Sequence, residues 1–101
     1  MSKALRLLGL ARRAGRLEIG EDGTLASIKS GRAKGVFLAE DAAENSRRRT
    51  NRLAEEHRIP CLILPVTKEV FGKALGRDVV AMAAVCDEGL ANAAIKAEQT
   101  E

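Results

Sequence analysis

Aromatic side chains are nearly absent from this chain of 101 residues, which holds two Phe and neither Trp nor Tyr. Both Phe37 and Phe71 stand in apolar contexts, where we expect them to be buried. Single-stranded nucleic acids are commonly bound by stacking bases on exposed aromatic rings. The composition therefore excludes that mode, and any nucleic-acid contact must use charge, backbone amides and aliphatic side chains.

Histidine and cysteine are equally scarce, at one and two residues. Cys61 and Cys86 stand far apart in apolar runs without CxxC spacing, so we expect buried thiols in a reducing cytoplasm, with no disulfide and no metal site. His57 follows two glutamates and is expected to be a solvated side chain at a helix end. No serine lies in a G-x-S-x-G turn. The sequence therefore predicts no enzyme activity, no cofactor and no small-molecule substrate.

Long apolar runs are also missing, so no segment has the length of a membrane span. The basic start, "MSKALRLLGLARRAG", interrupts its leucines with arginines and lacks the apolar region of a signal peptide. A hydrophobic share of 46% with 31% charged residues is typical of a water-soluble domain. Because no linker or repeat divides the sequence, we expect one cytoplasmic domain over residues 1–101 that contacts no membrane.

The net charge of +3 conceals an asymmetry between the two halves of the chain. Residues 1–52 carry 12 Lys and Arg against 6 acids, whereas residues 53–101 carry 5 against 8. A strongly basic half favours a polyanionic partner. RNA or another nucleic acid is therefore the first partner to consider.

Two periodicities alternate along the sequence. Helical spacing of apolar residues appears before Gly15, from Gly20 to Gly31, from Thr67 to Gly76 and after Asp87. The charged segment from Asp41 to His57 has few large apolar residues, and we expect a helix there that touches the core along a narrow stripe only. Between these segments stand "RLEI", which suits a short edge strand, and three apolar runs, "GVFLA", "CLIL" and "VVAMAAV", which suit buried strands. The order predicts a three-layer α/β/α sandwich around a small four-stranded sheet, mixed or mainly parallel, with right-handed helical crossovers.

The segment "AENSRRRTNRLAEE" carries the strongest charge signal. One interpretation is an exposed helix in which Glu44 pairs with Arg47 and Arg48, and Arg52 pairs with Glu55 and Glu56. The other is that Arg47, Arg48 and Arg52 remain free and bind phosphates without sequence preference. These three arginines are accessory candidates for RNA binding.

The segment "GEDGTLASIKSGRAKG" raises a second possibility for anion binding. Gly20 and Gly23 free the backbone at a helix N-terminus, where unpaired amides favour phosphate or base-edge acceptors. Lys29, Arg32 and Lys34 follow within the next turns. An ordinary strand-to-helix turn explains the same pattern equally well.

Several motifs in one order decide between these interpretations. "GEDGTLASIKSGRAKGVFLAEDA", "LAEEHRIPCLIL" and "TKEVFGKALGRDVVAMAAV" together resemble the ribosomal protein L7Ae family of kink-turn RNA-binding proteins, and especially its bacterial YlxQ-type members. The matching pieces include Ala39, Glu40 and Asp41 at the end of a strand and Ile59 with Pro60 before the next. The resemblance runs from about Gly20 to Val85 and implies a non-catalytic protein that binds structured RNA, ribosomal or ribosome-associated.

The resemblance also implies which residues contact the RNA. In the family, the entrance of the second helix reads the tandem sheared G·A pairs of a kink-turn, and the loop before the last strand covers an extruded nucleotide. Carried over, this gives a predicted site at the helix entrance and beyond it, comprising Gly20, Glu21, Asp22, Gly23, Thr24, Lys29, Arg32 and Lys34. On the other side it gives Lys68, Arg77, Asp78, Val79 and Val80.

Two alternatives remain open. The family signature has Asn, Glu and Lys where this chain has Asp22, Gly23 and Ala26, which favours a protein-interaction module on the same fold that has lost kink-turn recognition. A KH-type GxxG loop also matches Gly20 to Gly23, but such a loop joins two helices. Here the loop is expected to follow a strand.

Overall fold

The computed structural model describes residues 2–100 of the chain, and within them helices and strands alternate as predicted. In chain order the elements are α1 (Lys3–Arg13), β1 (Leu17–Ile19), α2 (Glu21–Lys29), β2 (Gly35–Ala39), α3 (Glu44–Glu56), β3 (Cys61–Leu64), α4 (Lys68–Ala74), β4 (Met82–Val85) and α5 (Glu88–Thr100).

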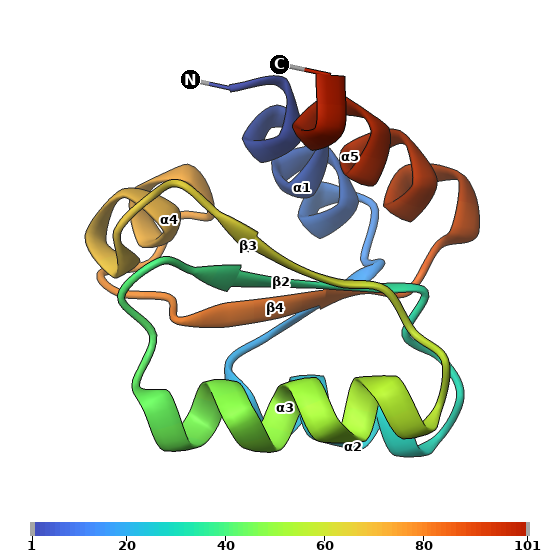
Figure 1. Cartoon of the computed structure of the whole chain (residues 1–101). Coiled ribbons are helices and arrows are strands. Elements are labelled where there is room, and N and C mark those ends of the chain that lie inside the picture. The colour runs from blue at the N-terminus through green and yellow to red at the C-terminus, as the bar shows by residue number, and fades with distance from the viewer. Residues whose placement is uncertain (1, 101) are drawn as a thin grey trace.

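The predicted three-layer α/β/α sandwich is confirmed. Helices α1 and α5 pack side by side on one face of the sheet, while α2 and α3 cover the other face (Figure 1). The short helix α4 lies at one end of the sheet and contacts α1. The α2 and α3 layer is therefore separated from α1 and α5 by the whole sheet.

The direction of the strands corrects one expectation. The sheet order is β1-β4-β2-β3, and only the β2–β3 pair is parallel, with Val36 opposite Cys61. β4 is antiparallel to both of its neighbours, with Val85 opposite Leu17 on one side and Gly35 on the other. Of the two arrangements expected, the mixed sheet is confirmed and mainly parallel pairing is wrong, because β4 inserts between β1 and β2 in reverse. Local periodicity does not encode this long-range arrangement.

Strand β3 is a second correction. Its apolar sequence "CLIL" predicts a strand buried on both faces, yet β3 forms an edge of the sheet and Ile63 is 49% exposed. The prediction of interior strands holds for β2 and β4, in which every residue is buried. Residues 79–81 of the run "VVAMAAV" precede β4 and belong to the loop before it.

The predicted helix boundaries rest on capping groups that the structure contains. The Thr67 hydroxyl accepts a hydrogen bond from the Val70 amide at 3.2 Å, and the Asp87 carboxylate accepts one from the Leu90 amide at 2.8 Å. Gly31 follows α2 with a φ of 81°, a left-handed conformation that favours glycine. These local signals explain why the element order was predictable from sequence.

The main core lies between the sheet and the α1, α4 and α5 layer. Phe37 and Phe71 are both fully buried there, as predicted, together with Leu8 and Leu75. On α4, Phe71 and Leu75 point inward, whereas Val70 is 48% exposed. A smaller cluster on the opposite face joins Ile28, Val36 and Ala54.

The cysteines are free thiols, but each is only half-buried. Burial still raises the pKa of the Cys61 thiol to about 11, and burial is the main cause of a raised pKa at Cys86. Over residues 2–100, no helix has both the length and the apolar character that crossing a membrane requires. The same residues contain no group of three His, Cys, Asp or Glu side chains placed to hold a metal ion.

Candidate nucleic-acid interface

The entrance of α2 is built by a glycine that follows β1 directly. Gly20 has a φ of 95°, and its amide donates a hydrogen bond to the carbonyl oxygen of Met82 at 2.9 Å. Gly20 offers no side chain to cap the helix, and the first intrahelical bond is donated by the Thr24 amide. The N–H groups of the first turn therefore face outward as donors. Because Gly20 follows a strand, the KH arrangement does not apply.

One end of the sheet brings this entrance together with the loop before β4. The Gly20–Met82 bond joins α2 to the start of β4, and the Val80 amide donates to the Lys68 carbonyl at 3.0 Å. The Lys68 amide in turn donates to the Asp41 carboxylate at 2.9 Å. Two segments that the sequence implicated separately, residues 20–24 and 77–80, thus share one end of the molecule, beside α4 (Figure 1).

The charge at this end is mainly negative. Exposed or half-exposed carboxylates belong to Glu21 and Asp22 in the first turn of α2, to Glu40 and Asp41 after β2, and to Asp78. The cations nearest in sequence to these segments are Lys68 and Arg77. Carboxylates repel phosphates but accept hydrogen bonds from the amino groups of base edges. This end is therefore better suited to base edges than to the phosphate backbone.

Glu21 is held in place by α3. Its Oε1 accepts a hydrogen bond from the Ser46 hydroxyl at 2.8 Å, and its Oε2 forms an ion pair with Arg49. The charge of Glu21 is thereby partly compensated, and the α2 entrance is tied to the first turns of α3. Asp22 is exposed, so it is the first-turn carboxylate most open to a ligand.

Three predicted contact residues have no side chain at the surface. Thr24 and Val80 are buried, and Gly23 has none. A Cβ added at Gly23 would stand 3.0 Å from Oε1 of Glu18, so the Glu18 side chain occupies the adjoining space. Val79, in contrast, is 55% exposed in the loop before β4. Thr24, Gly23 and Val80 therefore offer no side chain to a ligand, whereas the Val79 side chain is available for direct contact.

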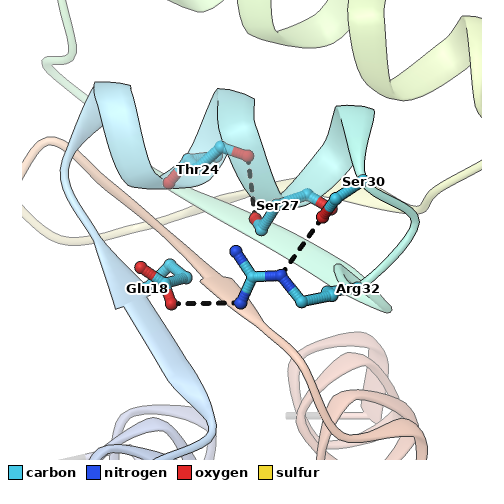
Figure 2. A network of polar contacts seen from close by, with 5 residues as sticks. All are labelled: Glu18, Thr24, Ser27, Ser30 and Arg32. Atoms are coloured by element: carbon cyan, nitrogen blue, oxygen red, sulfur yellow. Dashed lines mark hydrogen bonds and ion pairs between the residues drawn. The ribbon is translucent and has the colours of Figure 1, made fainter.

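The basic residues at the end of α2 and after it lie at its C-terminal end by backbone position, but the Arg32 side chain reaches back to Glu18, beside Gly23. Figure 2 shows Arg32 between Glu18 and Ser30: its Nη1 is 3.3 Å from the Glu18 carboxylate, and its Nε donates to the Ser30 hydroxyl at 3.1 Å. The Lys34 amide donates to the carbonyl of Val85, the last residue of β4. Lys29, Arg32 and Lys34 thus lie toward the C-terminal end of α2, and the structure does not join them to the loop before β4.

The arginines of α3 form one of the predicted ion pairs. Arg48 lies 3.9 Å from Glu44, and both side chains are about two-thirds exposed. Within the described residues neither Arg47 nor Arg52 has a carboxylate within 4 Å, so the expected pairs with Glu44, Glu55 and Glu56 are absent. Arg52 is therefore an uncompensated surface cation.

A groove between α2 and α3 was not predicted. It has a volume of about 510 Å³ and is lined by Leu25, Lys29, Asn45, Arg48, Arg49, Arg52, Leu53 and Glu56. The α3 members follow one another at helical spacing, which is a signal in the sequence for one face of a helix. What the sequence did not reveal is that Lys29 and Leu25 of α2 form the opposite wall.

Known proteins resemble this chain in both sequence and structure. RNA-binding protein YlxQ of Bacillus subtilis strain 168 is 35% identical over 86 residues, 85% of each chain. RNA-binding protein YlxQ of Enterococcus faecium is 44% identical over 62 residues, which are 61% of this chain and 60% of that one. A Bacillus halodurans protein of unknown function superimposes with a TM-score of 0.93 at 25% identity, over 98% of this chain and 99% of its own.

The fold is shared more widely. The Giardia lamblia 15.5kD RNA binding protein superimposes with a TM-score of 0.76 at 19% identity, over 94% of this chain and 84% of its own. Residues 2–95 match the family described as Ribosomal protein L7Ae/L30e/S12e/Gadd45. The match includes the α2 entrance, the α3 arginines and the loop before β4. The chain is thus a member of the ribosomal protein L7Ae/L30e/S12e/Gadd45 family.

Proposed function

We propose that this chain is a non-catalytic RNA-binding protein. The observation that carries the proposal is its 35% identity to a protein named RNA-binding protein YlxQ over 85% of both chains. Family membership over residues 2–95 supports it. Structured RNA, ribosomal or ribosome-associated, is the partner class.

The recognition surface is the end of the sheet that holds the α2 entrance and the loop before β4. The α2 entrance presents backbone N–H donors beside the exposed Asp22 carboxylate, a donor and acceptor pair suited to base edges. The loop adds the exposed aliphatic side chain of Val79 and the cation of Arg77. Lys68, at the start of α4, is positioned to reach a flanking phosphate.

A pair of RNAs tests this proposal. Protein is titrated into a labelled RNA that contains a kink-turn, and into the same RNA with its tandem G·A pairs replaced by Watson–Crick pairs, with fluorescence anisotropy as the readout. We expect the kink-turn RNA to bind roughly ten-fold more tightly or better, since each wrong base pair in a recognised site costs about 1–3 kcal/mol. Equal affinities would remove kink-turn recognition and leave general RNA binding.

Substitutions of its two cations test whether the proposed surface binds the RNA. Lys68→Ala with Arg77→Ala should weaken binding and lower the slope of log K against log salt by about one for each phosphate that is no longer neutralised. Lys96→Ala on α5, a helix that contributes no residue to the proposed surface, is the control and should bind as the wild type does. Failure of the wild type to bind either RNA at low salt would support a protein-interaction module instead.

A further inference from the structure

The groove between α2 and α3 is a basic surface separate from the α2 entrance. We call it the α2–α3 groove, meaning the 510 Å³ space lined by Leu25, Lys29, Asn45, Arg48, Arg49, Arg52, Leu53 and Glu56. Four of these residues are cations and one is an acid. The lining therefore has a formal charge of +3, equal to that of the whole chain, over a small area.

Most of the positive charge of the groove lining is not compensated by ion pairs. Neither Lys29 nor Arg52 has a carboxylate within 4 Å among residues 2–100. Arg48 pairs with Glu44 at 3.9 Å, but both partners are largely exposed, so the pair contributes little and opens easily. Only Arg49 is strongly engaged, by Glu21. At least three cations are thus available to an anion in the groove.

The floor and spacing of the groove suit a sugar-phosphate chain. Half-buried Leu25 and Leu53 supply an apolar floor between the cationic walls. Arg48 and Arg52 are one turn apart on α3, about 6 Å along its axis. Two guanidinium groups at that separation can contact neighbouring phosphates of one strand.

We propose that the α2–α3 groove binds the phosphate backbone of an RNA strand, without reading its sequence. The proposal rests on the RNA-binding function proposed above and adds a second contact to it. The first turn of α2 carries two carboxylates, and only Lys68 and Arg77 are proposed to reach phosphates beside it, so further electrostatic affinity is expected from another part of the protein. The Glu21–Arg49 ion pair joins the two surfaces, because Glu21 is the first residue of α2 and Arg49 lines the groove. RNA docked at the entrance can therefore continue into the groove.

The test uses a labelled oligo(U) RNA, which offers phosphates and no kink-turn, beside the kink-turn RNA. The double variant Arg48→Ala/Arg52→Ala removes two exposed cations of the groove. If two fewer phosphates are neutralised, the salt slope falls by about 1.4–1.8. Between 50 and 200 mM salt, wild-type affinity should therefore fall about seven- to twelve-fold more than that of the variant, for both RNAs.

A matched control and a gain of binding complete the experiment. Arg6→Ala/Arg13→Ala removes the same charge from α1, on the other side of the sheet, and should leave the salt slope within error of the wild type. Glu56→Gln removes the one acid of the groove lining and should tighten oligo(U) binding about two-fold, a change that impaired folding does not produce. Circular dichroism establishes that each variant is folded.

Each outcome bears on one proposal. If the double variant keeps the wild-type salt slope, or if the slope of the α1 control falls by as much, the groove proposal is overturned while RNA binding stands. An oligo-glutamate peptide, titrated as a further ligand, separates RNA binding from protein binding. If the wild type binds this peptide and the double variant does not, while the double variant binds RNA normally, the groove is a protein-docking site and the proposal is again overturned. If the wild type binds neither RNA, the proposed function itself fails.

Discussion

Thr24 and Thr50 are both fully buried, but their hydroxyls have different surroundings. The Thr50 hydroxyl donates to the Met82 sulfur at 3.4 Å, whereas the Thr24 hydroxyl has no hydrogen-bond partner among the described residues. A buried polar atom without a partner carries a desolvation cost of about 1–3 kcal/mol. The unpaired Thr24 hydroxyl at the α2 entrance therefore lowers the free energy of unfolding of the protein.

Replacing Thr24 with Val, which has nearly the same shape, should raise the free energy of unfolding by about 1 kcal/mol, because the unpaired hydroxyl is removed. Chemical denaturation measures this change. RNA affinity should be unaltered, since the Thr24 side chain does not reach the surface.

The same substitution at Thr50 is the matched control. It removes a hydroxyl that has a partner, so it should stabilise the protein less than Thr24→Val. A loss of stability in Thr24→Val would show that its hydroxyl has a partner in solution.

At the scale of elements, α4 positions the loop before β4 through close backbone contact. Gly72 is buried in α4, and a Cβ added there would lie 2.7 Å from the carbonyl oxygen of Asp78 and 2.9 Å from that of Arg77. These are backbone atoms, which cannot move without shifting the loop. The absence of a side chain at residue 72 therefore lets the loop lie against α4.

Gly72→Ala should destabilise the protein by about 1–3 kcal/mol and weaken RNA binding, because the loop must shift. This runs against the usual effect in a helix, where Ala is favoured over Gly by about 1 kcal/mol. Denaturant unfolding and RNA titration measure the two effects.

Gly9→Ala in α1 is the control for helix propensity. The new Cβ would make only ordinary contacts, the nearest being the Ala74 carbonyl oxygen at 3.7 Å, so this variant should be as stable as the wild type or more so. If both variants behave alike, the close approach at Gly72 does not constrain the loop.

At the scale of the whole molecule, the two faces of the sheet have different roles. The larger core lies under α1, α4 and α5, while the α2 and α3 side carries a small core, the α2 entrance and the groove. Stability is therefore concentrated on one face, and the candidate recognition surfaces lie on the other face and at one end.

Leu8→Ala tests this separation. Leu8 is fully buried in the larger core, so its truncation should lower the free energy of unfolding by about 2–5 kcal/mol. RNA affinity measured at a temperature where the variant stays folded should equal that of the wild type. Leu10→Ala, at a position that is 45% exposed, should change stability by less than about 0.5 kcal/mol. A large loss of RNA affinity in folded Leu8→Ala would mean that the two faces are coupled.

The element order was predictable because its signals are local. Thr67 and Asp87 cap the helices that follow them, and the apolar run "GVFLA" forms a buried strand whatever its neighbours are. The exposure of Ile63 was not predictable in this way. An apolar residue at a sheet edge has the same local sequence as one in the middle.

For the site, the sequence identified both segments at the end of the sheet through resemblance, and the structure brings Gly20 and the loop before β4 to that end. The prediction from sequence also grouped Lys29, Arg32 and Lys34 with Gly20, because these residues are near one another in the sequence. The nine-residue helix α2 separates the backbone of Gly20 from that of Lys29 by about 13 Å, although the Arg32 side chain reaches back to Glu18, which lies beside Gly23.

The sequence by itself determined the order of the helices and strands, that both Phe side chains are buried, and which family the chain resembles. Only the tertiary structure decided that β4 runs antiparallel between β1 and β2, that β3 is an edge, and that Lys29 faces Arg48 and Arg52 across a groove. The reason is physical: capping, turns and periodicity act within a few residues, whereas strand direction, exposure and the shape of a groove depend on which distant segments pack together.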